Sequence, residues 1–294
     1  MGAPDTIFAK SYGDVISLLA QQEGSQILKH NALTIKRNVV GEETYMDQIA
    51  SDDMEDVTGR LQTVTLNNPN YSRRRIAKYG FTKAYGLDTH DLLASVPDPT
   101  SPLVQNLMYA AGRKYDDRIL TAARGTSYTG QEGGTSVALP AAQKVAAGGT
   151  GLTVAKLRSA KLIMDQGKVP FQDRFLALDA LGMEDLLATT EVTSSDYNTV
   201  KALVQAQLDT FLGFKIIQLE APVSSNATNT LGSSGASYAV AWHKTGLGLA
   251  VWADMGASID KRIDLVGQPK QLSYNMSIGA SRLEEAKIVE IAFV

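Results

Sequence analysis

The feature that most constrains the fold is a long one-sided helix predicted between residues 102 and 124. Apolar side chains recur there at spacings of four, three, four, four and three residues, at Val104, Met108, Ala111, Tyr115, Ile119 and Ala122. This spacing places them on one face of an α-helix. Ser101 and Pro102 favour a helix start, and Gly125 favours a stop. At about 1.5 Å per residue the rod is about 35 Å long, so we expect it to lie across a sheet as a structural beam.

The rest of the C-terminal half alternates helical and strand patterns. Helices are predicted from Thr153 to Gln166, from Met183 to Ala188 and from Asp196 through Leu208. Strands are predicted at residues 175–178, 214–219 and 238–242 and within 258–278, where Ile259, Ile263 and Leu265 share a face. The final residues, 288–294, are mostly apolar, so we expect them to be buried in a sheet. Residues 125–151 are rich in Gly, Ser, Thr and Ala and are predicted to be a mobile loop.

Residues 36–85 show a sharp separation of charge. A block of acids without a base is followed by a block of bases without an acid. The acids are Glu42, Glu43, Asp47, Asp52, Asp53, Glu55 and Asp56, and the bases are Arg60, Arg73, Arg74, Arg75, Lys78 and Lys83. Residues 61–66 alternate with period two, and residues 67–70 (Asn-Asn-Pro-Asn) supply turn chemistry. The pattern predicts a two-stranded ribbon with an acidic limb and a basic limb.

Charge alone leaves two interpretations of this ribbon open. The limbs can screen each other as cross-strand pairs on a solvated hairpin. Alternatively, the ribbon reaches onto a neighbouring molecule, where one limb meets its opposite; a lone hairpin is marginal in water, which favours such docking. Nucleic-acid binding through Arg73-Arg74-Arg75 is a weaker interpretation, because the adjacent acids would repel phosphate.

Composition and motifs give no support for catalysis. The chain has 294 residues, a net charge of −3 and no cysteine, which removes disulfides and thiolate chemistry. Its three histidines, His30, His90 and His243, lie in different segments without ligand spacing. Adjacent acids such as Glu284-Glu285 point to different faces, so they do not share a proton. No apolar stretch reaches the roughly 18 to 20 residues of a membrane span. We therefore expect no enzyme activity, no cofactor and no metal site.

The order and spacing of these elements resemble the major capsid proteins of tailed bacteriophages, most closely the coat proteins of short-tailed phages. The resemblance covers roughly residue 15 to the end and rests on short motifs that follow the ribbon and the long helix. These are Phe175-Leu176-Ala177-Leu178-Asp179, Gly213-Phe214-Lys215-Ile216-Ile217, Ala241-Trp242-His243-Lys244 and Gly279-Ala280-Ser281-Arg282. It implies an α+β chain with the Hong Kong 97-type phage coat fold.

The resemblance also implies a division of the chain. An N-terminal arm is expected at 1–35, an extended β-hairpin loop with flanking strands at 36–85, and a peripheral domain with the spine helix 102–124 at 86–169. An axial domain is expected at 170–250, with 224–237 as its tip loop. Return strands of the peripheral domain follow at 251–283, and the final axial strand at 284–294. The ribbon would then lie on the next subunit, and the contacts between subunits are expected to involve Glu42, Glu43, Asp52, Asp53, Glu55, Asp56, Arg60, Arg73, Arg74, Arg75 and Lys78.

The function implied by the resemblance is self-assembly. Hexamers and pentamers would tile an icosahedral or prolate shell around phage double-stranded DNA, with maturation from a procapsid. The implied partners are copies of the chain itself, a scaffolding protein, a portal and a decoration protein, with packaged DNA nearby. The implied location is the virion capsid, with assembly in the host cytoplasm. The alternatives are an encapsulin-like nanocompartment shell around enzyme cargo, another virion structural protein, and an enzyme with a dispersed site.

Overall fold

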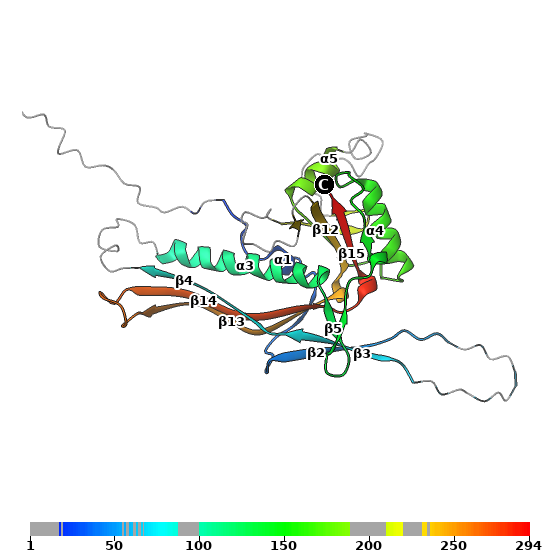
Figure 1. Ribbon diagram of the computed structural model, residues 1–294, viewed down its shortest axis with the longest axis horizontal. Coiled ribbons are helices and arrows are strands. Elements are labelled where there is room, and N and C mark those ends of the chain that lie inside the picture. The colour runs from blue at the N-terminus through cyan, green and yellow to red at the C-terminus, as the bar shows by residue number, and fades with distance from the viewer. Residues whose placement is uncertain are drawn as a thin grey trace, which may run out of the picture.

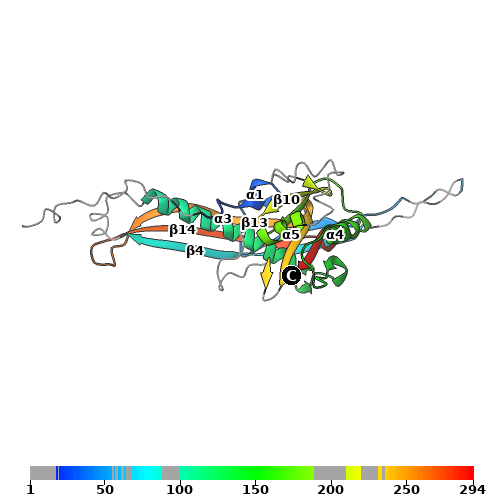
Figure 2. The same ribbon diagram turned by 90° about the horizontal axis from the view of Figure 1, so that it is seen from above.

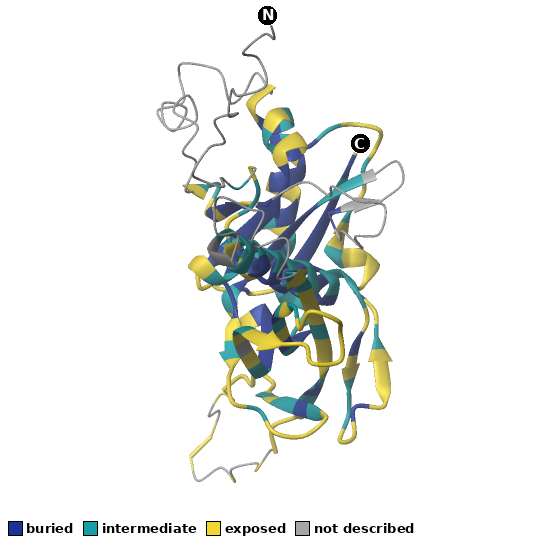
Figure 3. Ribbon diagram, turned by 90° about the vertical axis from the view of Figure 1, so that its left-hand side faces the viewer, coloured by how far each residue is buried: buried dark blue, intermediate teal, exposed yellow. Residues whose placement is uncertain are grey.

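The structure is a computed structural model that describes residues 18, 20–54, 56, 59–60, 63, 66, 68–87, 100–188, 210–219, 231–233 and 236–294. Most of the predicted arm, the predicted helix from Asp196 and most of the loop 224–237 lie outside these residues. The described part contains three sheets arranged around one long helix (Figure 1). Buried residues gather along the middle of the molecule, and the hairpin ends are exposed (Figure 3).

The long helix α3 (Thr100–Arg124) lies across a four-stranded sheet. The sheet order is β1 (Thr34–Lys36), β13 (Leu247–Lys261), β14 (Lys270–Arg282) and β4 (Tyr79–Leu87). Figures 1 and 2 both show α3 running along these strands. Tyr115 and Ile119 pack against Met276 and Ile278 in one core cluster. The predicted beam across a sheet is therefore confirmed.

The bounds and the buried face of α3 differ slightly from the prediction. The helix begins at Thr100, and it ends before Gly125, whose N–H bonds the Thr121 carbonyl at 2.8 Å. Leu107 is buried at 1% exposure, whereas Met108 is 54% exposed. Successive residues of a helix are about 100° apart, so the side chains of Leu107 and Met108 both project within about 60° of the side chain of Ala111. The apolar spacing alone could not choose between them.

A second lobe is built on a seven-stranded sheet. Its path runs β7 (Lys144–Val145), β15 (Ile288–Phe293), β12 (Ala236–His243), β8 (Arg174–Leu178), β10 (Phe214–Gln218) and β9 (Thr210–Phe211), and β11 (Gly232–Ser233) pairs with β12. Phe293 has no exposed surface, which confirms the burial predicted for the last strand. Trp242 is also fully buried; its Nε1 donates to the Ala32 carbonyl at 2.7 Å, and its ring stacks on Phe175.

Two helices cover one face of this sheet. They are α4 (Val154–Gln166), capped by Thr153, and α5 (Ala180–Ala188). Leu157 and Met164 of α4 share a core cluster with Phe293 and with Leu186 of α5. The predicted helix 153–166 therefore packs in the second lobe, rather than with α3 as the expected grouping into 86–169 implied. The reason is its buried face, which fits the apolar side of β15 and β8.

A third sheet contains the ribbon. Its order is β2 (Glu43–Ile49), β3 (Tyr71–Ala77), β5 (Ser127–Thr129) and β6 (Thr135–Val137). The strands therefore lie on either side of the predicted period-two stretch 61–66, of which the described residues Thr63 and Leu66 are not in strands. Residues 125–151 contain β5, β6, β7 and the turn η2 (Ala141–Gln143), so the mobile-loop prediction was wrong. These strands are too short, at two or three residues, to produce an alternating pattern.

The remaining short elements connect the sheets. They are α1 (Gln26–Lys29), η3 (Lys244–Gly246) and η4 (Glu285–Lys287). The predicted strand face of Ile259, Ile263 and Leu265 continues only to Lys261, where β13 ends. Ile263 is 82% exposed in the turn between β13 and β14. Ile263 and Leu265, which fit the apolar spacing, therefore lie in an exposed turn and not in a strand.

Candidate functional site

The ribbon brings together four of the charged residues that the sequence singled out. In the antiparallel register Asp47 lies opposite Arg73, and Arg73 Nε donates to Asp47 Oδ1 at 2.6 Å. Arg75 and Glu43 form a second pair at 3.1 Å. The hydrogen bond from Arg73 lowers the pKa of the Asp47 carboxyl below its ordinary value. The screening interpretation therefore holds for these four residues, which neutralise one another within the subunit.

Aromatic rings extend this exposed face of the ribbon. The Arg73 guanidinium lies 5.3 Å from the centre of the Tyr45 ring, and that of Arg75 lies 4.7 Å from the Tyr128 ring. Gly133, in the β5–β6 turn at a φ of +64°, faces the Arg75 side chain so closely that a Cβ would lie 2.5 Å from Arg75 Cδ. The turn therefore holds Arg75 against Tyr128. The face presents arginine and tyrosine, which are enriched at protein interfaces.

The other predicted contact residues are spread along the ribbon and its loop. Glu42 and Lys78 are exposed at the base, where Lys78 N donates to the Glu42 carbonyl at 3.1 Å. Asp52, Asp53, Asp56 and Arg60 are exposed in the segment that joins β2 to β3, and Glu55 lies outside the described residues. The same segment carries Met54 at 100% and Leu66 at 94% exposure. Its described residues thus combine acidic charge with uncovered apolar side chains.

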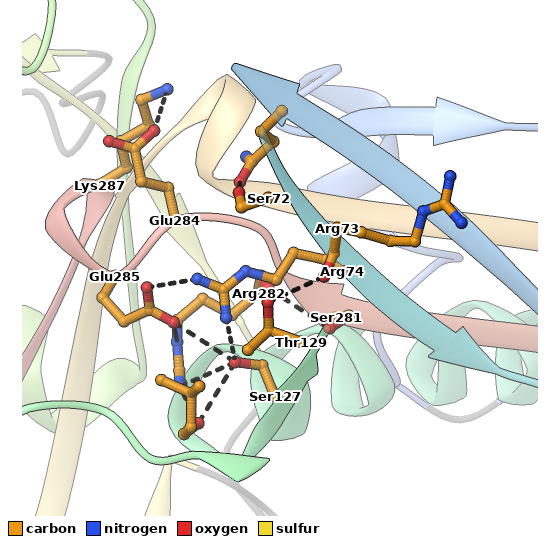
Figure 4. A network of polar contacts seen from close by, with 12 residues as sticks. Ser72, Arg73, Arg74, Ser127, Thr129, Ser281, Arg282, Glu284, Glu285 and Lys287 are labelled. Atoms are coloured by element: carbon orange, nitrogen blue, oxygen red, sulfur yellow. Dashed lines mark hydrogen bonds and ion pairs between the residues drawn. The ribbon is translucent and has the colours of Figure 1, made fainter. Parts of the chain in front are cut away.

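Arg74 points in the opposite direction, into the body of the protein. Side chains alternate along a strand, so Arg74 leaves the face that carries Arg73 and Arg75. Its Nη2 donates to Glu285 Oε2 at 2.7 Å, and Arg282 Nε reaches the other oxygen of that carboxylate at 3.4 Å (Figure 4). Arg282 has no exposed surface, and burial lowers its pKa. One carboxylate therefore holds two guanidinium groups in the interior.

Arg282 also donates hydrogen bonds to residues at the ends of neighbouring elements. Its Nη1 donates to the carbonyls of Ala123 and Gly125 at 3.1 and 2.7 Å, which lie at the C-terminal end of α3. Its Nη2 donates to Ser127 Oγ and to the Val137 carbonyl of β5 and β6. A cation at a helix C-terminus is favourable because the carbonyls there carry partial negative charge. The Arg74–Glu285–Arg282 cluster therefore ties the ribbon to α3 and to the turn before β15.

The base of the ribbon rests on two glycines. A Cβ on Gly279 of β14 would overlap the Ala77 carbonyl of β3, and a Cβ on Gly248 of β13 would lie 2.7 Å from Met46 Sδ. At Gly279 no other residue type allows this approach of two backbones, whereas at Gly248 the neighbour is the Met46 side chain. The ribbon thus crosses the four-stranded sheet at a fixed point.

Residues 22–26, which precede and begin α1, are fastened to α3 by hydrogen bonds and by close packing. Asp116 of α3 is 4% exposed and accepts hydrogen bonds from Ser25 Oγ, from Gln22 Nε2 at 2.7 Å and from the Gln26 N–H at 2.9 Å. A Cβ on Gly112 would overlap the backbone of residues 24 and 25. Burial raises the pKa of the Asp116 carboxyl despite these donors.

Sequence reasoning missed the buried polar groups. Asp116 is more than 85 residues from its partners, and Arg282 is at least 145 residues from the carbonyl and hydroxyl groups that it binds. No local pattern marks a charge that will be enclosed by such tertiary contacts. The adjacent acids Glu284 and Glu285 do diverge as predicted, since Glu284 pairs with Lys287 at 2.6 Å and Glu285 turns inward. His243 ends strand β12, as predicted for a residue in the framework, and its Nδ1 lies 2.9 Å from Thr245 Oγ1.

The described residues contain no group of three or more His, Cys, Asp or Glu side chains that could hold a metal ion. In the same part of the chain, no helix has the length and apolar character needed to cross a membrane.

Nearly the whole chain is similar to known proteins. Residues 5–294 match a family model described as phage capsid protein. No curated protein matches the sequence. The capsid structure of cyanophage P-SCSP1u is similar, with a TM-score of 0.72 at 16% identity over 99% of this chain and 94% of that chain. The head structure of Helicobacter pylori bacteriophage KHP40 has a TM-score of 0.74 at 12% identity, covering 99% and 96%. The capsid of Ralstonia phage GP4 has a TM-score of 0.72 at 10% identity, again covering 99% and 96%.

Proposed function

The chain belongs to the phage capsid protein family, and we propose that it is the major capsid protein that closes a shell around double-stranded phage DNA. The family is a structural, non-enzymatic one of shell-forming proteins, and the fold is the mixed helix and sheet fold of phage capsids. Assembly proceeds through hexamers and pentamers into an icosahedral or prolate particle, with maturation from a procapsid. The observation that carries the proposal is the match along residues 5–294.

The packing of the subunit supports a division of labour between two domains. The peripheral domain comprises α3 and the sheet β1-β13-β14-β4, and the axial domain comprises the seven-stranded lobe with α4 and α5. The ribbon β2–β3 is the extended loop, and the segment before α1 is the N-terminal arm. This grouping moves residues 154–166 from the expected peripheral domain to the axial one.

The ribbon's contact with the next subunit is made by its loop rather than by its arginines. Arg73 and Arg75 are already paired in the subunit, and Arg74 belongs to the interior. The joining segment instead offers Asp52, Asp53 and Asp56 together with the uncovered Met54. Head-to-tail contacts of this kind close into rings. Scaffolding, portal and decoration proteins are further proposed partners, and the host cytoplasm is the proposed place of assembly.

Negative-stain electron microscopy of the purified protein tests the function. Closed polyhedral particles are expected, whereas a protein that stays monomeric at high concentration would refute the proposal. Reversing Asp52, Asp53 and Asp56 to Lys should abolish particles while leaving the thermal unfolding of the subunit unchanged. The neutral triple Asn variant is the control for loss of charge without reversal. Normal particles from the Lys variant would refute the role of the loop.

A further inference from the structure

Helix α4 has an uncovered face that carries an exposed leucine and a basic residue. Its exposed positions are Ala155, Arg158, Ser159, Leu162 and Gln166, which fall on one side of the helix at spacings of three and four residues. Leu162 is 56% exposed. Arg158 lies one turn before it and forms no ion pair within the described residues. Small side chains at 155 and 159 leave room for another helix to approach.

Helix α5 has an uncovered face of the same kind with the opposite charge. Leu181, Glu184 and Leu187 lie on its exposed side at spacings of three residues. The two leucines are 44% and 36% exposed, and Glu184 lies between them. The helix contains no basic residue, and its buried side, with Gly182 and Leu186, is already used against Phe293 and the sheet.

The two helices cover the same face of the seven-stranded sheet but lie at different places on the lobe. Helix α4 runs along the lobe beside β15, and α5 lies across the end of the lobe (Figure 1). A head-to-tail ring needs two different and complementary patches on each subunit. One patch here is an apolar stripe with a positive charge, and the other is an apolar stripe with a negative charge. Each stripe could cover the other with its leucines buried and its charges paired.

We propose that α4 of one subunit docks on α5 of the next copy of this chain, with Leu162 between Leu181 and Leu187 and with Arg158 against Glu184. This inference rests on the proposed function, because it assigns a contact within the shell. A second copy is the occupant because the two stripes carry opposite charges and both expose leucine side chains. Helix faces with anchors spaced three and four residues apart are a common mode of docking.

Charge exchange tests the pairing directly. The variants are Arg158→Glu, Glu184→Arg and the double variant that carries both. Each single reversal places like charges across every copy of the contact, so the concentration needed for assembly should rise by about tenfold or more. The double variant restores opposite charges and should return to the wild-type concentration. Arg158→Lys and Glu184→Asp keep the charges and serve as the controls.

Assembly is measured by sedimentation velocity and negative-stain microscopy over a range of concentrations, with thermal unfolding to check the fold of each variant. Both sites are exposed, so unfolding should be unchanged. Single reversals that assemble like the wild type would overturn the contact while leaving the capsid function intact. Failure of the double variant to recover would overturn the pairing of α4 with α5. Absence of particles from the wild-type protein would instead refute the proposed function, and this contact with it.

Discussion

Replacing Glu285 by Gln removes the one carboxylate between two buried guanidinium groups. Arg282 has no exposed side-chain surface and Arg74 has 10%, so neither can recover its lost partner from water. Breaking a buried ion pair by neutralising one member costs about 3–5 kcal/mol. With an unfolding entropy of about 2.1 cal/mol/K per residue, a chain of this size loses about 1.6 °C of melting temperature for each kcal/mol. We therefore expect the melting temperature to fall by at least about 5 °C.

The neighbouring residue supplies a matched control. Glu284 pairs with Lys287 at 2.6 Å, but its side chain is 43% exposed. An exposed pair contributes about 0–1 kcal/mol, so Glu284→Gln should leave the melting temperature nearly unchanged. Differential scanning calorimetry measures both variants in the same assembly state, established beforehand by sedimentation. Equal melting temperatures for the two variants would show that the buried cluster does not stabilise the fold as argued.

Three further outcomes follow from the same structure. Gly279→Ala should destabilise the protein by about 1–3 kcal/mol, because the added methyl group would overlap the Ala77 carbonyl. Urea unfolding measures this loss, and Gly256→Ala is the control because Gly256 has open space around it. Asp116→Ala should cost about 2 kcal/mol or more, because the Ser25 hydroxyl and the N–H groups of Gln26 and Ile27 lose their acceptor. Hydrogen exchange at residues 25–30 should then speed up more than in the lobe, and uniform exchange would contradict a local fastening. The Asp264 carboxyl, whose pKa the Arg262 hydrogen bond lowers to about 2, should titrate near that value by NMR and return toward 3.8 in Arg262→Ala. Since its folded pKa is depressed, this pair stabilises the turn above pH 3.8 and the contribution is lost as the pH falls through about 2. An unchanged titration in Arg262→Ala would contradict that cause.

Elements with a strong local pattern were predictable from the sequence. The long helix, helix 154–166 with its Thr153 cap and Gly167 stop, and the buried strands β8, β10, β12 and β15 all match predicted segments. In each of these elements the pattern of apolar residues can be read from residues that are close together in the sequence. The buried last strand was equally clear, because a run such as 288–293 has no stable alternative in water.

The short strands and the Arg74–Glu285–Arg282 cluster could not be predicted from patterns of residues close together in the sequence. Strands β5 and β6 have three residues each; β5 exists because β3 offers it a partner, and β6 pairs in turn with β5. The three consecutive arginines looked alike in the sequence, yet Arg73 and Arg75 form surface pairs while Arg74 is buried with Glu285, 211 positions away. Alternation along a strand assigns Arg74 to the other face, but only the tertiary fold decides that this face is the interior.

The attachment of α3 at its C-terminal end has a mechanical consequence. Arg282 grips the last carbonyls of a helix of 25 residues, which at about 1.5 Å per residue spans about 37 Å. Since α3 also packs along β13 and β14, the helix and this sheet would tilt together about a pivot near the ribbon. A tilt of about 5° at the pivot moves the opposite end by about 3 Å over that length. A small rotation at the ribbon end of α3 therefore produces a larger displacement at the opposite edge of the subunit.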